Sequence, residues 1–262
     1  MTPVLIPIIN GKELTRNCIK SVLAQDVPCE VFVLDNGATD GSGEMLRAWA
    51  DDRIHYIAAR KPSVAASWNF GLKWLFAQGH AAVLVLNNDT ELRPDTVRWL
   101  LADGGPFVTA VGAAEKEKIA PQIFGSIKGG VFTKGKEFEI QPEEYYAPPD
   151  PAMKRPFPDY SCYLIRRECW DIVGPFDENF LGAFCEDLDH HIRIHKAGMS
   201  AMCLELPFYH VGSATINTAD EPLRKDISAQ AQKNREYFKK KWGVGVGTSE
   251  YYAIFGGHGE PQ

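Results

Sequence analysis

Short apolar runs alternate with amphipathic stretches through the first hundred positions of the chain. Residues 4–9 and 30–35 are apolar runs typical of buried strands. The segment between them carries apolar residues at helical spacing, namely Leu14, Cys18, Ile19, Val22 and Leu23. Together these three segments predict a β-α-β unit.

The same alternation continues to residue 86. The pattern predicts a helix around Met45, Leu46 and Trp49, a strand over 54–58, a long helix over 64–76 and a strand over 81–86. Strands separated by helices predict a mostly parallel sheet with helices on both faces. Ligands of such sheets bind beyond the carboxyl ends of the strands, so the loops 35–42 and 87–91 are expected to line the site.

The pattern is less regular in the second half. Gly104 to Pro158 is rich in glycine and proline, with short β-like runs at 122–124 and 130–133, and is interpreted as an acceptor-side insertion or lid. We then expect a strand over 160–166, a helix from Glu186 to just before Gly198, a strand toward His210 and a polar helix over 221–242. The lysines at 239–241 are interpreted as a solvated helix end.

Composition and charge narrow the class of protein. The chain has 262 residues, 45% of them hydrophobic and 24% charged, which is typical of a globular protein. A net charge of −6 argues against a polynucleotide-binding module, so nucleic acid is not an expected partner. The chain has six cysteines without a C-x-x-C pair, which predicts a cytoplasmic protein. Its apolar start is broken by prolines, so we expect no transmembrane segment. A lipid acceptor would then be reached only peripherally at the membrane.

Polar side chains follow the strand that ends at residue 86. The apolar run ends abruptly and is followed by Asn87, Asn88 and Asp89. This order places the Asp89 carboxylate at the edge of the predicted sheet. Mg²⁺ and Mn²⁺ bind one or two such carboxylates together with substrate phosphates. The tripeptide alone fits equally well a turn in which Asp89 caps the next helix.

An acidic cluster opens the helix predicted at residue 186. Mutual repulsion among Glu186, Asp187 and Asp189 favours a raised pKa for one of them, which suits a general base. Asp189 is better explained as an i,i+4 partner of Arg193, so Asp187 is the preferred base. His210, just beyond the next strand, is a better metal-ligand candidate than the i,i+4 histidines at 191 and 195.

An ordered set of segments resembles a known family. The chain is similar to the family 2 glycosyltransferases of the GT-A fold, particularly the rhamnosyltransferase-like branch, over residues 6–10, 33–42, 64–69, 86–91, 173–178, 186–189, 210–213 and 237–243. The resemblance implies an α/β, Rossmann-like α/β/α sandwich with a central, mostly parallel mixed sheet. It further implies a single domain over 1–243, with a nucleotide-binding half (1–103), an acceptor or catalytic half (104–218), a C-terminal helix (219–243) and a tail (244–262).

The resemblance also implies roles for particular residues. Asp187 would be the general base with Glu186 in reserve, and Asp89 and His210 would hold the metal. The nucleotide sugar would be bound by Pro7, Ile9, Asn10, Asp35, Asn36, Lys61, Ser67 and Asn88. Many relatives have an acidic residue at the position of Asn36 and an aromatic or other stacking residue at that of Ile9, so the resemblance does not identify the nucleobase. Asn87 and Asn88 replace acidic residues of many relatives, which leaves Asp89 as the only carboxylate at that position of the metal loop.

The resemblance thus implies an inverting hexosyl- or deoxyhexosyltransferase. It would use a UDP-, dTDP- or GDP-sugar and a divalent cation, Mn²⁺ or Mg²⁺, and transfer the sugar to a hydroxyl of a glycan, lipid-linked or protein acceptor. A non-catalytic nucleotide-sugar-binding module is one alternative. A nicotinamide-dependent oxidoreductase is another, but it requires a G-x-G-x-x-G turn after the first strand, and residues 7–11 do not have this pattern.

Overall fold

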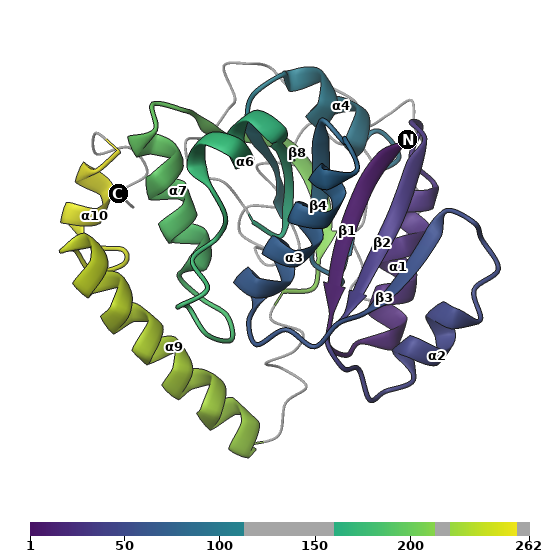
Figure 1. Ribbon diagram of the computed structural model, residues 1–262, viewed down its shortest axis with the longest axis horizontal. Coiled ribbons are helices and arrows are strands. Elements are labelled where there is room, and N and C mark those ends of the chain that lie inside the picture. The colour runs from purple at the N-terminus through teal and green to yellow at the C-terminus, as the bar shows by residue number, and fades with distance from the viewer. Residues whose placement is uncertain (113–159, 213–220, 256–262) are drawn as a thin grey trace, which may run out of the picture.

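A computed structural model describes residues 1–112, 160–212 and 221–255 of the chain. The first half alternates strands and helices as expected (Figure 1). Its elements are β1 (Thr2–Ile8), α1 (Lys12–Leu23), β2 (Cys29–Asp35), α2 (Ser42–Arg47), β3 (Ile54–Ala58), α3 (Val64–Ala77), β4 (Ala82–Leu86), β5 (Thr90–Glu91) and α4 (Thr96–Asp103). The predicted β-α-β alternation is confirmed.

The second half contains three elements that the pattern did not predict, a strand over 107–112 and helices over 167–173 and 249–253. Its elements are β6 (Phe107–Gly112), β7 (Cys162–Arg166), α6 (Arg167–Val173), α7 (Glu186–Lys196), β8 (Ala201–His210), α9 (Glu221–Trp242) and α10 (Ser249–Ala253). Strand β6 lies inside the region interpreted as an insertion, and α10 lies inside the expected tail. The rest of the expected lid, residues 113–159, lies outside the described residues.

The described strands form one mixed sheet in the order β3-β2-β1-β4-β7-β6-β8-β5. Strands β1 to β4 pair in parallel, whereas β7 runs antiparallel to both β4 and β6. Strand β8 is parallel to β6 and therefore runs in the same direction as β4. The carboxyl ends of β2, β4 and β8 consequently share one edge of the sheet.

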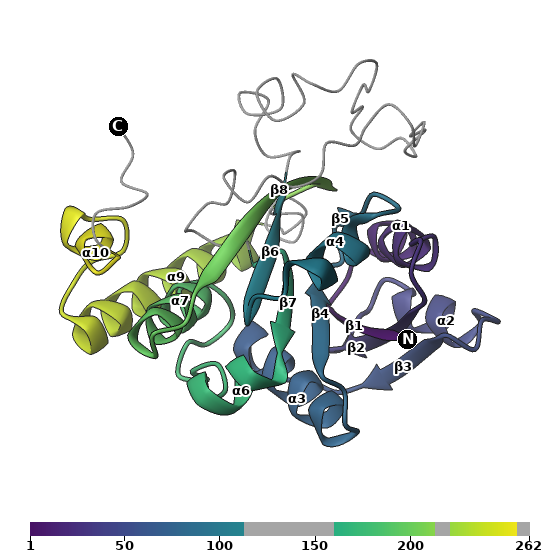
Figure 2. The ribbon, with the colours of Figure 1, turned by 90° about the horizontal axis from the view of Figure 1, so that it is seen from above.

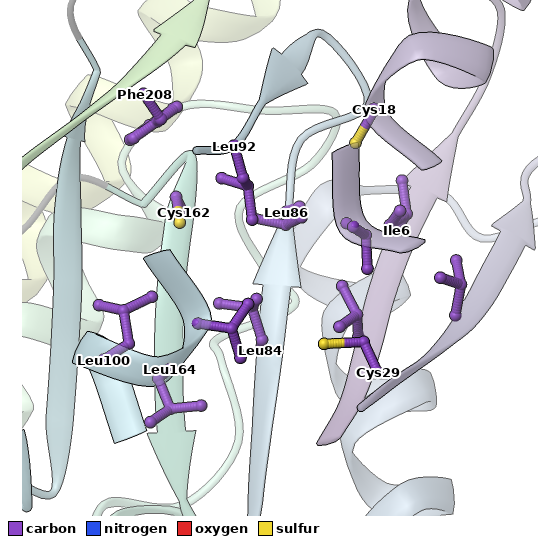
Figure 3. Close-up of a cluster of buried hydrophobic side chains, with 14 of the residues drawn as sticks. Ile6, Cys18, Cys29, Leu84, Leu86, Leu92, Leu100, Cys162, Leu164 and Phe208 are labelled. Atoms are coloured by element: carbon purple, nitrogen blue, oxygen red, sulfur yellow. The ribbon is translucent and has the colours of Figure 1, made fainter. Parts of the chain in front are cut away.

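Helices cover both faces of this sheet, which confirms the α/β/α arrangement (Figure 2). Helices α1, α2 and α4 pack on one face with alternate residues of β1 and β4, such as Ile6 and Leu84 (Figure 3). Helices α3, α6 and α7 pack on the other face with residues such as Leu5 and Val85. Strand residues that face one layer of helices alternate with residues that face the other, because successive side chains of a strand point to opposite faces.

Helix α3 approaches β1 unusually closely. A Cβ atom added at Gly71 would lie 2.4 Å from Leu5 Cδ2, and Leu5 is fully buried. Only glycine allows this approach without displacing the core. The first turn of α3, which begins at Val64, is thereby held against the carboxyl edge of the sheet.

Helices α9 and α10 form a further layer outside α7 (Figure 1). Their contact is a separate apolar cluster in which Phe180, Ile192, Phe238 and Tyr251 are buried. The segment after residue 243 is therefore part of the fold as far as it is described, because Tyr251 is only 2% exposed. None of the described helices is both long and apolar enough to cross a bilayer.

Candidate active site

The carboxyl edge of the sheet brings Asp89 and His210 together. Residue Thr90 of β5 pairs with His210 of β8, and the backbone N–H of Val211 donates to the Asp89 carbonyl at 3.0 Å. The Asp89 Oδ1 atom lies 3.3 Å from His210 Nε2, and both side chains are less than a tenth exposed. The two proposed metal ligands are thus adjacent, although they are remote in sequence.

This pair has the chemistry of a partial cation site. A carboxylate oxygen and an imidazole nitrogen are donors that Mn²⁺ accepts, and a diphosphate supplies further oxygen ligands. Within residues 1–112, 160–212 and 221–255, no group of three or more His, Cys, Asp or Glu side chains is arranged around a common ion. The residues therefore fit a cation that is shared with a phosphate-bearing ligand.

Asparagine side chains link the loops that follow β1, β2 and β4 at this edge. Asn88 Nδ2 donates to the Asn10 carbonyl at 2.8 Å and to Thr15 Oγ1 at 2.9 Å. Asn10 Oδ1 in turn accepts from the backbone N–H of Thr39 at 2.9 Å. Ile9, which precedes Asn10 in the loop after β1, is 52% exposed. The asparagines hold the loops in place, and Ile9 offers an apolar surface to solvent.

Asp35 lies at the base of a hollow of about 310 Å³. Its Oδ1 accepts from the backbone N–H groups of Gly37 and Ala38, and its Oδ2 accepts from the Tyr56 hydroxyl at 2.7 Å. The hollow is also lined by Arg47 and Arg60. Neither arginine nor Tyr56 was suggested by the sequence, because Arg47 and Tyr56 occupy ordinary positions in α2 and β3 and Arg60 lies in the loop after β3.

Of the other four predicted sugar-nucleotide residues, three are engaged within the protein. Asn36 Oδ1 accepts from the backbone N–H of Lys61 at 3.1 Å, while Lys61 Nζ lies 3.9 Å from the centre of the Phe70 ring. Ser67 is 2% exposed, and its Oγ donates to the Ser63 carbonyl at 2.9 Å within α3. Pro7, at the end of β1, is half-buried.

The acidic motif opens α7 after a strained turn. Phe184 and Cys185 have φ angles of 82° and 73°, and within the described residues they alone adopt positive φ without being glycine. Such conformations cost of order 1–3 kcal/mol each and occur preferentially at functional sites. Asp187 follows directly, half-buried, and its Oδ1 accepts from the backbone N–H of Leu188 at 2.8 Å.

Glu186 is the buried member of the acidic motif. It is 5% exposed, and its Oε2 has no hydrogen-bond partner among the described residues. Burial, together with the charge of Asp187, raises the pKa of Glu186 well above its usual value. Of the two carboxyl groups, Asp187 is the one more accessible to an acceptor.

Glu186→Gln is expected to stabilise the fold increasingly as the pH rises. The unfolded chain releases the Glu186 proton near its ordinary pKa of about 4.3, whereas the folded chain keeps it to a higher pH. Wild-type stability therefore falls as the pH rises between these two pKa values. Because Gln cannot ionise, the difference in unfolding free energy should grow by up to about 1.4 kcal/mol per pH unit in that interval.

Urea unfolding of both proteins from about pH 5 to about pH 7 measures this difference. A difference that does not change with pH would show that Glu186 is already ionised in the folded protein.

The chain is similar in sequence to several known proteins. Residues 4–118 match the family model described as glycosyl transferase family 2. An uncharacterized protein of Mycobacterium tuberculosis is 28% identical over 161 residues, which are 59% of this chain and 56% of that protein. The O-antigen biosynthesis protein RfbC of Myxococcus xanthus is 25% identical over 76% of this chain and 16% of its own length. The chain thus spans only part of the length of these relatives.

Solved structures share the fold at low sequence identity. Staphylococcus aureus TarS 1-349 has a TM-score of 0.54 at 15% identity, covering 97% of this chain and 78% of that one. The mannosyltransferase PcManGT of Pyrobaculum calidifontis, in complex with GDP-Man and Mn²⁺, has a TM-score of 0.52 at 17% identity over 80% of this chain and 56% of that one. The described residues therefore have the fold of GT-A glycosyltransferases, and with the family 2 match over 4–118 they support a glycosyltransferase.

Proposed function

We propose that this protein is an inverting glycosyltransferase that moves a sugar from a nucleoside diphosphate to an acceptor hydroxyl. The observation that carries the proposal is the meeting of Asp89 and His210 at the carboxyl edge of the sheet. The turn before the acidic motif reaches the start of α3, which follows the carboxyl end of β3, because the backbone N–H of Val64 donates to the Gly182 carbonyl at 2.7 Å. The Asp35 hollow lies beyond the carboxyl end of β2, at the same edge. One end of the edge thus suits a nucleoside and the other a reacting sugar.

Asp187 accepts the proton of the acceptor hydroxyl. The acceptor oxygen attacks the anomeric carbon from the side opposite the diphosphate, so that the new C–O bond forms as the bond to the diphosphate breaks and the configuration inverts. A well-placed general base contributes roughly 10²–10⁴ in rate. Asp187 is better suited than Glu186 because a base must reach the proton that it removes.

Asp89 and His210 would hold a divalent cation against the diphosphate. Such a cation, when bound, neutralises charge that develops on the leaving oxygen. The Mn²⁺ in the PcManGT complex supports this part of the proposal. GDP-Man in that complex, and UDP in a complex of TarS with a TM-score of 0.52, likewise support a nucleotide-sugar donor.

A thermal-shift screen tests the proposal. UDP, dTDP and GDP and their sugars are added with and without Mn²⁺, because a ligand that binds only the folded state raises its stability. At about 100 times its Kd, a donor should add about 2.7 kcal/mol, which corresponds to roughly 5–10 °C for a chain of this size. The donor found in this way is then incubated with candidate acceptors, and the anomeric configuration of the product is read by NMR. If no nucleotide raises the melting temperature and none of the sugars is hydrolysed or transferred, the proposal is wrong.

A further inference from the structure

The turn that precedes the acidic motif is bound by one side chain of α9. Asn234 Nδ2 donates to the carbonyls of Leu181, Ala183 and Phe184 at 2.9, 2.8 and 3.0 Å. Three carbonyl oxygens require a donor, so the orientation of the amide is determined by its surroundings. Asn234 is only 1% exposed. Water therefore cannot readily replace it as the partner of these carbonyls.

The conformation of this turn needs such support. Phe184 and Cys185 both have positive φ angles, which crowd their Cβ atoms against the following carbonyl. A strained backbone of this kind persists only where its surroundings hold it. The Phe184 carbonyl is one of the three that Asn234 binds, and the Cys185 carbonyl accepts from the backbone N–H of Asp189 in the first turn of α7.

Lys241 of α9 makes a second contact, which joins the residues before and after this turn. Lys241 Nζ lies 2.6 Å from Asp177 Oδ2, before the turn, and 2.6 Å from Asp189 Oδ1, after it. Asp189 is fully buried and also accepts from Trp242 Nε1 at 3.0 Å. Lys239 and Lys240 are exposed, as expected of a solvated helix end, whereas Lys241 joins two carboxylates. Helix α9 lies along α7 in both views (Figures 1 and 2).

From these contacts we infer that α9 is the positioning element of the acidic motif. Asn234 and Lys241 are its positioning residues: they hold the strained turn at residues 181–185 and thereby set the place of Asp187 at the start of α7. The inference rests on the proposed function, in which Asp187 acts on the acceptor. Because the predicted donor contacts lie at the ends of β1 to β4 and in α3, outside the acidic motif, loss of either residue should lower kcat and leave donor binding unchanged.

The test compares Asn234→Leu with Phe238→Leu in the full chain. Leucine has about the size of asparagine but cannot donate to the carbonyls. Phe238 lies one turn further along α9 and is fully buried in the apolar cluster with Phe180. Phe238→Leu therefore weakens the same interface without touching the three carbonyls. Lys241→Gln and Lys241→Arg form a second pair, in which only arginine keeps the charge that joins Asp177 to Asp189.

Two readouts are needed. Hydrogen exchange of the ligand-free proteins should be faster at amides 182–187 in Asn234→Leu than in wild type or Phe238→Leu, with β1–β4 unchanged. In transfer assays with saturating acceptor, Asn234→Leu should lose on the order of 10²-fold in kcat, as expected for a catalytic group displaced by about 1 Å, while the KM for the donor stays within about twofold. Lys241→Arg should retain the kcat that Lys241→Gln loses.

The inference is overturned if Asn234→Leu and Phe238→Leu lower kcat in the same proportion to their loss of stability. It is also overturned if exchange at 182–187 is unchanged. If Asn234→Leu does not fold, the Lys241 pair decides by the same two readouts. If the wild type transfers no sugar, the proposed function fails separately, and exchange alone decides the positioning: faster exchange supports it and unchanged exchange overturns it.

Discussion

Asp187→Asn is expected to lower kcat by roughly 10²–10⁴-fold, the usual contribution of a general base. Binding of the nucleotide sugar should be unchanged, because the predicted donor contacts lie at the ends of β1 to β4 and in α3, outside the acidic motif. The fold should be retained as well: an asparagine oxygen can still accept from the backbone N–H of Leu188, as Asp187 Oδ1 does now at 2.8 Å. Single-turnover transfer and donor titration measure the two effects separately.

The matched control is Asp171→Asn on α6. That carboxylate is 54% exposed and pairs only loosely with Arg167, at 3.6 Å. It should lose almost no activity. If Asp187→Asn keeps turnover within a few-fold of wild type, Asp187 is not the base, and loss of activity in Glu186→Gln would then assign that role to Glu186.

Asp89→Asn is expected to remove the effect of Mn²⁺ on both binding and transfer. In the described residues the Asp89 carboxylate is the negatively charged partner of His210, and an amide oxygen is a much weaker ligand for a hard cation. Charge neutralisation by a bound cation amounts to several kcal/mol in such reactions, so kcat/KM should fall on the order of 10²–10³-fold. The extra thermal shift that Mn²⁺ gives with a nucleoside diphosphate should disappear.

Glu91→Gln provides the comparison for this variant. Glu91 is a carboxylate on β5, two residues after Asp89, where its backbone pairs with Tyr209 rather than with His210. Its substitution should leave the Mn²⁺ dependence intact. A Mn²⁺-dependent shift in Asp89→Asn that matches wild type would place the cation elsewhere and remove the role assigned to Asp89 and His210.

Much of the fold could be predicted because its signals are local. The apolar runs that become β1, β2 and β4 are mostly buried and bounded by polar loops, so their length and spacing identify them as buried parallel strands. The polar helix predicted over 221–242 is α9, Glu221–Trp242, because Gly243 provides a left-handed stop with φ of 76°. Such features need no knowledge of the rest of the chain.

Strand β6 shows where local signals fail. Phe107–Gly112 follows two glycines and a proline, which the pattern alone presents as the start of a loop. It becomes a strand between β7 and β8 because pairing on both sides satisfies its backbone groups. Helix α10 is a similar case, since Tyr251 and Phe255 are ordered by burial against α7 and α9.

The sequence by itself determined the kinds of chemistry that this protein can offer: a carboxylate after β4, an acidic motif before α7 and a histidine at the end of β8. Only the tertiary structure decided that Asp89 meets His210, that Glu186 is buried while Asp187 remains accessible, and that Lys241 and Asn234 hold the turn before the motif. The reason is physical. Spacing along a chain sets which residues share an element, but distances between elements depend on strand order and direction, which the packing of the whole core selects.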